Sequence, residues 1–274
     1  MPVESVFLFY HTDATAITRY GLSSTNIYIL VLFRNDVHYG VTSEINRNPS
    51  MAQVEKGKTF IFIDGQNLYL SARSAFGSNV VPYPNFDARL LGEAIGLEVG
   101  AGIIEKISFY TGMPVDRYSP RWHEFWTNKL EAMEEDLVSV YTRPLRYQYE
   151  TDPLQPTGYK ILSTREKGID LRIALDVMIA ARRKDCENIV IVSRDQDFRE
   201  VIEDIEMMTA FERRDINLWS AYPDGGNGPS HLRGIDGMKS VIITPEMYRN
   251  CLDPVDYRGR YTPRSQAQEP SFSV

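Results

Sequence analysis

The stretch from residue 166 to residue 198 constrains the fold more than any other part of this chain. It begins with an apolar segment, Asp170 to about Lys184, which opens on a carboxylate and is long enough for a helix. A second apolar run, residues 189–192, is typical of a buried strand, and Asp195 and Asp197 follow where that strand should end. This layout predicts an acidic metal site on an α/β sheet.

Strands and helices alternate from Lys58 onward, which favours a parallel sheet with helices on both faces. We predict strands at residues 59–63, 103–110, 137–141, 189–192, 216–221 and 241–244. We predict helices at residues 68–75, 87–95, 119–133, 170–184 and 198–208. Residues 143–149 are basic and aromatic, and we expect them to form a loop.

The first predicted strand, residues 59–63, ends at Asp64. In open parallel sheets the binding sites form outside the carboxyl ends of the strands, so Asp64 and Asp195 should emerge at one edge if their strands are near neighbours. Gly65 would allow a ligand or the backbone to approach closely. The alternative is that Asp64 only caps the following helix with help from Asn67, because aspartate also favours such positions for local hydrogen bonds.

Asp195 and Asp197 form the stronger pair, because capping a helix needs only one of them. Crowded carboxylates raise one another's pKa unless a cation lies between them, so the cluster implies a metal or a shared proton. Asp176 is the single charge in an apolar helical segment, and it is either a metal ligand or the partner of Arg172 in an ion pair. Asp170 lies roughly 120° away from it around an ideal helix, so Asp170 is the preferred ligand.

Several carboxylates without histidine or cysteine among them favour the hard cations Mg²⁺ or Mn²⁺. These ions activate water and stabilise the charge that develops on a phosphodiester, so hydrolysis of a phosphate ester is the expected reaction. The four histidines are scattered at positions 11, 38, 123 and 231, and no P-loop or dinucleotide-binding motif is present. A histidine-based metal site and a nucleotide-binding fold are therefore not expected.

A net charge of -7 argues against long-range attraction to nucleic acid but leaves room for a local basic patch. Basic and aromatic side chains near the expected site could hold a phosphate backbone and stack an unpaired base: Lys167, Arg194, Arg143, Arg146, Tyr147 and Tyr149. For each one alone, a solvated surface charge is the commoner role. Two cysteines and the absence of an apolar run near ~20 residues predict a cytoplasmic protein that does not cross the membrane.

The chain divides into three parts by sequence. Residues 1–56 form an N-terminal extension in which residues 27–33 predict a strand; a further hypothesis is that Met51 is the native start and that no structured domain precedes it. Mass spectrometry of the protein from its natural host tests this start. Residues 57–250 form the α/β domain, and residues 251–274 are expected to be a flexible tail.

Three motifs in this order resemble the NYN domain of the LabA-like family, which belongs to the PIN-like nuclease superfamily: Ile63-Asp64-Gly65-x-Asn67-Leu68, Lys167-Gly168-Ile169-Asp170 with Asp176 farther along the helix, and Ser193-x-Asp195-x-Asp197-Phe198. The resemblance covers roughly residues 57 to 245 and includes Tyr110-x-Gly112 and Arg143-Pro144-Leu145. It implies a three-layer α/β sandwich with a central, mostly parallel sheet and helices on both faces. It also implies RNA cleavage dependent on Mg²⁺ or Mn²⁺, with Asp64, Asp170, Asp195 and Asp197 as pocket acids and Asn67 as a polar neighbour.

One position departs from the family pattern. The segment Ser193-Arg194-Asp195 stands where the family usually has Ser-Gly-Asp, so Arg194 either binds the scissile phosphate or obstructs it. The leading hypothesis is an endoribonuclease that acts on single-stranded RNA, with Asp64, Asp170 and Asp195 holding the metal and Lys167 or Arg194 contacting phosphate. The rival is a non-catalytic RNA-binding or regulatory scaffold that retains the pocket, and a DNA nuclease is a third hypothesis. A homodimer is compatible with the sequence, which does not fix the oligomeric state.

Overall fold

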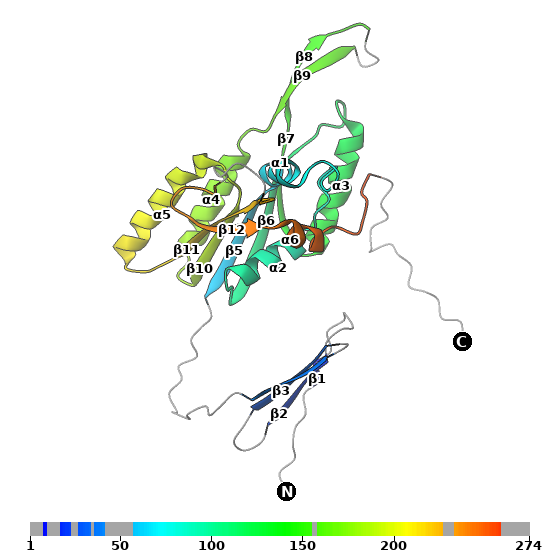
Figure 1. Ribbon diagram of the computed structural model, residues 1–274. Helices are drawn as coiled ribbons and strands as arrows, with labels where there is room; N and C mark the ends of the chain where they lie inside the picture. Colours follow the sequence, from blue (N-terminus) through cyan, green and yellow to red (C-terminus); the bar gives the residue numbers. More distant parts are fainter. Residues whose placement is uncertain are drawn as a thin grey trace, which may run out of the picture. The chain divides into compact units, whose positions relative to one another are not determined.

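The computed structural model describes residues 57–154, 158–226 and 233–258, together with the backbone of four strands within residues 8–41 (Figure 1). The chain forms two compact units, residues 1–55 and residues 56–274. The first unit contains an antiparallel sheet in the order β1 (Leu8–Phe9), β2 (Ile17–Leu22), β3 (Ile27–Phe33), β4 (Asp36–Val41). The strand expected at residues 27–33 is therefore present, with three further strands beside it. Met51 lies outside the described residues, and the native start stays a prediction.

The second unit is built on a six-stranded sheet in which every neighbouring pair is parallel. Its order is β12 (Lys239–Ile243), β11 (Asn217–Pro223), β10 (Cys186–Val192), β5 (Lys58–Asp64), β6 (Ile103–Met113), β7 (Ser139–Pro144). The central strands are buried on both faces, which explains their unbroken apolar sequences. The predicted α/β class and the parallel arrangement are confirmed.

Helices cover both faces of this sheet (Figure 1). One core contains Ile61 and Ile63 and is shared by α1 (Gly65–Phe76), α2 (Ala88–Glu98), α3 (Pro120–Glu135) and α6 (Pro245–Asn250). The opposite core contains Phe60 and Phe62 and is shared by α4 (Ile169–Ala181) and α5 (Arg199–Glu212). Because successive side chains of a strand point to opposite faces, one apolar run in β5 supplies both cores. The three-layer sandwich is confirmed.

Local signals place most helix ends where the sequence predicts them. The Asp87 side chain accepts a hydrogen bond from the Leu90 backbone N–H at 2.9 Å and caps α2, and Pro120 occupies the first turn of α3. The helix expected to start at Phe198 is preceded by a short 3-10 helix, η1 (Gln196–Phe198), and α5 begins one residue later. Helix α6, capped by Thr244, was not expected from the sequence.

The prediction of a loop at residues 143–149 is wrong. Its first residues extend β7, and the rest form β8 (Arg146–Thr151), which pairs with β9 (Tyr159–Arg165) in an antiparallel two-stranded sheet that projects from the unit in Figure 1. Tyr147 and Tyr149 alternate with polar residues, a pattern that suits a strand. The strand depends on β9 for its hydrogen bonds, so a reading of residues 143–149 alone could not identify it.

Residues 251–258 are also not a flexible tail, because they pack on the α/β unit. Leu252 forms a β-bridge with Phe86, the Tyr257 ring is 5% exposed, and Asp253 forms an ion pair with the buried Lys129 at 2.7 Å. The rest of the expected tail, residues 259–274, lies outside the described residues. No helix among the described residues is long and apolar enough to cross a membrane.

Candidate active site

The order in which successive strands are added to the sheet reverses between β5 and β10. From β5 the chain adds β6 and β7 on one side, and from β10 it adds β11 and β12 on the other. Asp64 is the last residue of β5, and Ser193 to Asp195 follow directly after β10. Ligands of open parallel sheets bind at the carboxyl ends of the strands where such a reversal occurs. The two strands are neighbours, which was the condition for a shared edge, so Asp64 and Asp195 emerge at the same edge.

Asp64 is the buried carboxylate of this edge and is 4% exposed. One of its oxygens, Oδ1, accepts a hydrogen bond from the Asn67 backbone N–H at 3.0 Å and caps α1. The other, Oδ2, accepts one from the Ser193 hydroxyl at 3.3 Å. The pKa of the Asp64 carboxyl is raised to about 6, mainly by burial and also by the negative charges of Asp170 and Asp195, against the lowering effect of the two hydrogen bonds. Capping alone does not explain a buried acid with this environment.

Ser193 and Asn67 connect the ends of the two strands. The Ser193 hydroxyl donates to Asp64 and accepts from the Asp195 backbone N–H at 3.2 Å. The Asn67 side-chain oxygen accepts from the Arg194 backbone N–H, also at 3.2 Å. These bonds fix the turn after β10 against the first turn of α1. Both residues therefore orient the acidic edge.

Asp170 lies in the first turn of α4, and Asp195 and Asp197 lie on either side of Gln196 at the start of η1. The Asp195 side chain accepts a hydrogen bond from the Asp197 backbone N–H at 3.0 Å. Loss of hydration and then the negative charges of Asp195 and Asp197 raise the pKa of Asp170. These three acids, with Asp64, form one electrostatically coupled group, which we call the acidic cluster.

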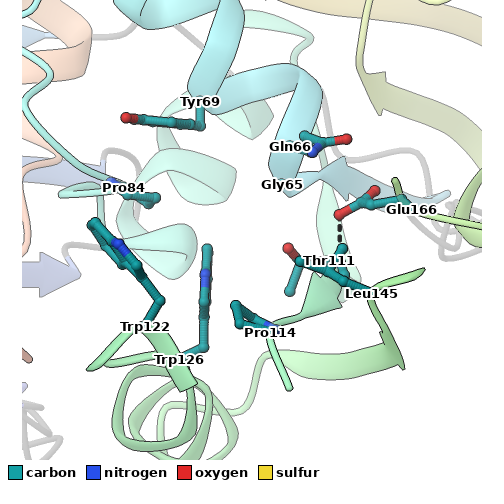
Figure 2. A pocket seen from close by; sticks show the side chains of 11 residues that line it. Gly65, Gln66, Tyr69, Pro84, Thr111, Pro114, Trp122, Trp126, Leu145 and Glu166 are labelled. Atoms are coloured by element: carbon teal, nitrogen blue, oxygen red, sulfur yellow. Dashed lines mark hydrogen bonds between the residues drawn. The ribbon is translucent and has the colours of Figure 1, made fainter. Parts of the chain in front are cut away.

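Glu166 is a further acid of this edge that the sequence reasoning did not select. Its carboxylate accepts a hydrogen bond from the Gly112 backbone N–H (Figure 2). Burial raises the pKa of Glu166 to about 7, and the negative charges of Asp64 and Asp170 also raise it, whereas the bond from Gly112 lowers it. The sequence signal that could have identified Glu166 was its position two residues before Gly168, the glycine that precedes the first turn of α4.

Asp176 does not join the acidic cluster. Both of its oxygens accept hydrogen bonds from the Arg172 guanidinium, at 2.7 and 2.9 Å, and one also accepts from the Tyr110 hydroxyl at 2.9 Å. The ion pair one turn away was the alternative that the sequence left open, and the structure contains it. The position of Asp176 favours a structural role over metal binding.

Asp176→Ala should destabilise the fold without removing the acidic cluster. The substitution leaves the Tyr110 hydroxyl, which belongs to a residue 2% exposed, without its partner, at a cost of about 1–3 kcal/mol. Urea unfolding measures this cost, with Asp204→Ala on the exposed surface of α5 as the control. A folded Asp176→Ala protein with the stability of the parent would contradict this structural role.

Arg194 is held on the β11 side of the edge. Its guanidinium donates a hydrogen bond to the Arg233 carbonyl at 3.1 Å and lies over the Tyr222 ring at 5.6 Å from the centroid. No ion pair joins this guanidinium to an acid among the described residues. The side chain expected to bind or obstruct the phosphate is thus occupied elsewhere in this structure.

A second group of basic side chains does come together. A pocket of about 510 Å³ is lined by Val115, Tyr118, Arg143, Pro144, Leu145, Arg146, Tyr147 and Lys167, and we call it the basic pocket. Arg143 donates to the Tyr141 hydroxyl at 2.8 Å, and its guanidinium lies so close to Gly168 that a Cβ there would be 2.6 Å from Nη1. The pocket therefore adjoins the start of α4, where Asp170 lies.

The chemistry of the acidic cluster fits a hard divalent cation. Burial and mutual repulsion raise the pKa of Asp64, Glu166 and Asp170, and a bound cation would relieve that repulsion. Within the described ranges, no three acid, histidine or cysteine side chains are arranged to hold a metal ion by themselves. Mg²⁺ commonly keeps several waters and uses one or two carboxylates together with substrate phosphates, so the donors suit an ion held in that way.

Comparison with known proteins places this site in a family. The sequence model of the NYN domain matches residues 58–212, which is more than half of the chain and spans β5 through α5. Searches of curated proteins and of solved structures returned no match. The matched segment contains all four members of the acidic cluster and Glu166. The chain belongs to the NYN domain family of PIN-like nucleases.

Proposed function

We propose that this protein is a metal-dependent endoribonuclease of the LabA-like branch that hydrolyses phosphodiester bonds of single-stranded RNA. The observation that carries the proposal is the acidic cluster at the reversal point of the sheet, where a buried aspartate has its pKa raised to about 6 beside two further acids. Nucleases of the PIN-like type need such a group of carboxylates for a divalent ion. We retain from the sequence the predictions of a cytoplasmic location and of a homodimer as a compatible state.

Each member of the cluster has a proposed role. Asp64, Asp170 and Asp195 would hold Mg²⁺ or Mn²⁺ together with water and a substrate phosphate, some of them through bound water, and Asp197 would add negative charge to the site. The bound ion would supply an activated water and stabilise charge on the phosphate in the transition state. Asn67 and Ser193 keep the Asp64 carboxylate in one orientation.

Glu166 supplies a proton-transfer group. A carboxyl with its pKa raised to about 7 is present in both protonation states near neutral pH, which suits an acid or a base. The Gly112 N–H binds one oxygen of this carboxylate, and Glu166 also lines a pocket at this edge. We assign to Glu166 the transfer of a proton to or from the reacting oxygens.

The basic pocket supports an RNA substrate. Arg143, Arg146 and Lys167 can contact successive phosphates, and the rings of Tyr118 and Tyr147, whose centroids are 4.6 Å apart, offer surfaces on which bases stack. Unpaired bases are needed for such stacking, so single-stranded RNA fits better than a duplex. DNA remains the alternative substrate, because no residue is assigned to the 2′-hydroxyl.

Lys167→Ala and Arg143→Ala should each weaken RNA binding and lower its salt dependence. A lost phosphate contact reduces the slope of log affinity against log salt concentration by about 0.7 for a single strand. Fluorescence anisotropy with labelled RNA over a range of salt concentrations measures this slope. Lys184→Ala, just beyond the other end of α4, is the control and should leave the slope unchanged. Equal slopes in all three variants would contradict a role of the basic pocket in RNA binding.

Cleavage by Asp195→Asn tests the function. Removing this charge should slow Mn²⁺-dependent cleavage of an end-labelled single-stranded RNA by at least ~10²-fold, because the acidic cluster then lacks an anionic ligand. Asp204→Asn on α5 should cleave like the parent protein. Internal cuts in the product ladder identify an endonuclease. An Asp195→Asn protein as fast as the parent would contradict the proposed function.

The RNA-binding scaffold is the second candidate, and one observation favours it. No three acids of the described residues hold an ion unaided, so the pocket as it stands depends on water or substrate to complete the metal's ligands. Thermal unfolding with increasing Mn²⁺ separates the two functions. If Mn²⁺ raises the melting temperature only when Asp64 and Asp195 are present, and the protein cleaves no RNA, the RNA-binding scaffold is the function.

A further inference from the structure

A second pocket lies directly beside the acidic cluster. Its volume is about 180 Å³, and it is lined by Gly65, Gln66, Tyr69, Pro84, Thr111, Gly112, Pro114, Trp122, Trp126, Leu145 and Glu166. Figure 2 shows the rings of Tyr69, Trp122 and Trp126 on one side and Gln66, Thr111 and Glu166 on the other. We call it the aromatic pocket. No part of the proposed hydrolysis uses its aromatic side.

Two nearly buried residues present polar atoms to this pocket. Thr111 is 3% exposed and Trp126 is 8% exposed, yet within the described part of the chain neither the Thr111 hydroxyl nor the Trp126 indole N–H makes a hydrogen bond. Among those residues, the one buried and unpaired side-chain polar atom is the Ser108 hydroxyl. Within this same part of the chain, the polar atoms of Thr111 and Trp126 make no hydrogen bond and are not among the fully buried unpaired atoms, so they retain some exposed surface. Both residues line the aromatic pocket, so we infer that this surface is reached from the pocket. Unpartnered polar groups in a largely apolar pocket are what a ligand with its own polar edge requires.

The walls of the aromatic pocket are held in place before a ligand arrives. The Trp126 ring packs against Phe109 and Phe125, with centroids 5.9 and 5.3 Å apart. Gly112 keeps the opposite side open, because a Cβ there would lie 2.7 Å from the Glu166 side chain and would also meet Leu145. Such a preformed site loses little conformational entropy when it binds a flat ring.

The aromatic pocket also has a fixed relation to the other two sites. Gly65 directly follows Asp64, and Glu166 is near enough to Asp64 and Asp170 to feel their charges. Leu145 lines both this pocket and the basic pocket. A ligand bound among the aromatic rings would thus lie next to the acids, and its continuation could reach the basic pocket.

We propose that the aromatic pocket binds one unpaired nucleobase of the RNA, adjacent to the phosphodiester held at the acidic cluster. The inference rests on the proposed function, which supplies the RNA. A cavity of about 150 Å³ accommodates benzene, so the volume suits a single base and excludes a base pair. Tyr69 and Trp122 stack on the base, while the Thr111 hydroxyl, the Trp126 indole N–H and Gln66 contact its polar edge. The pocket is therefore the specificity-determining subsite of the enzyme.

The test uses RNA binding in EDTA, so that its result does not depend on cleavage. Single-stranded RNAs of about ten nucleotides, each with one abasic position, are compared by anisotropy with the unmodified strand. Loss of the base that occupies the pocket should weaken binding by about 5- to 150-fold at one position and little elsewhere. A small, equal effect at every position would overturn the proposal.

Two sets of variants locate the effect. Thr111→Val keeps the side-chain shape and should weaken binding of the unmodified RNA by about 2- to 10-fold, while Thr127→Val on the exposed surface of α3 should not. RNA should quench tryptophan fluorescence in Trp219→Phe but not in the protein with Trp122→Phe and Trp126→Phe. Unchanged binding by Thr111→Val, or quenching that survives the double change, would overturn the subsite. If either of these results is found but RNA cleavage still requires Asp195, only the subsite is wrong and the proposed function stands.

Discussion

Asp64→Asn is expected to abolish RNA cleavage and to make the protein more stable. The substitution removes a negative charge from the centre of the acidic cluster, and we expect cleavage to fall by about 10²–10⁴-fold. The asparagine oxygen can still accept the bond from the Asn67 N–H, and asparagine is itself a good cap, so the start of α1 should survive. Its NH₂ group takes the place of the other oxygen, so the Ser193 hydroxyl would have to accept a hydrogen bond there rather than donate one. Single-turnover cleavage of labelled RNA measures the loss.

The gain in stability follows from the raised pKa of Asp64. At pH 7 the ionised carboxylate is buried, and the difference between a pKa of about 6 and the ordinary value of 3.8 corresponds to a cost of about 3 kcal/mol. Removing that cost should raise the melting temperature by roughly 6–12 °C for a protein of this size. Sites that act on charged substrates commonly give up stability in this way.

The pH dependence of the stability difference between Asp64→Asn and the parent protein tests whether the raised pKa of Asp64 is the cause of that difference. Below about pH 6 the folded protein protonates Asp64 while the unfolded chain stays ionised down to about pH 4, so the parent protein gains stability as the pH falls through this range. Glu166, with its pKa raised to about 7, contributes a change of the same sign. The advantage of Asp64→Asn should therefore shrink between pH 7.5 and pH 5. A variant that is less stable than the parent at pH 7.5 would show that Asp64 serves only as a helix cap.

The fold and the acidic edge follow from local patterns, because parallel strands impose their own geometry. Apolar runs that end in aspartate place those carboxylates at one edge once the strands are neighbours, and β5 and β10 are neighbours. Helix ends were predictable for a similar reason, since Asp87 and Pro120 act on the turn that follows them. Apart from the pairing of β5 with β10, each of these features depends on residues close together in the chain.

The features that were missed depend on distant partners. Glu166 follows the last residue of β9 and takes its hydrogen bond from Gly112, 54 positions earlier in the chain. The choice between two roles for Asp176 rests on Tyr110 as well as on its neighbour Arg172. The Arg194 guanidinium is held by Tyr222 and the Arg233 carbonyl, both later in the chain. No periodicity or motif in the sequence encodes such contacts.

Asp253→Ala should produce the largest loss of stability among the substitutions considered. Its carboxylate forms an ion pair with Lys129, whose side chain is 1% exposed, and burial lowers the pKa of that lysine against the attraction of Asp253. The same carboxylate accepts the Val255 backbone N–H at 3.0 Å. Removing it leaves the ammonium group with the Phe86 carbonyl, which it contacts at 2.8 Å, and nearby aromatic rings as its remaining partners.

Breaking a buried ion pair by removing one partner costs about 3–5 kcal/mol, which corresponds to a fall in melting temperature of roughly 6–20 °C. Glu203→Ala is the matched control, because its pair with Arg199 is exposed, is screened by water and should contribute little to stability. Thermal and urea unfolding of both variants measure the difference. Replacing both partners, as Lys129→Met with Asp253→Asn, should recover most of the loss, since no unpaired charge then remains in the core.

The comparison decides where the domain ends. A large loss in Asp253→Ala and a small one in Glu203→Ala mean that residues 251–258 belong to the folded unit and cover the core through Cys251 and Tyr257. Equal, small losses mean that this segment behaves as the flexible tail that its sequence predicts. The hydrogen bonds and the ion pair described above for Asp253 and Lys129 involve each other, Phe86 and Val255 and no member of the acidic cluster. Cleavage per folded molecule should therefore be unchanged in Asp253→Ala, and any loss of activity should track the unfolded fraction.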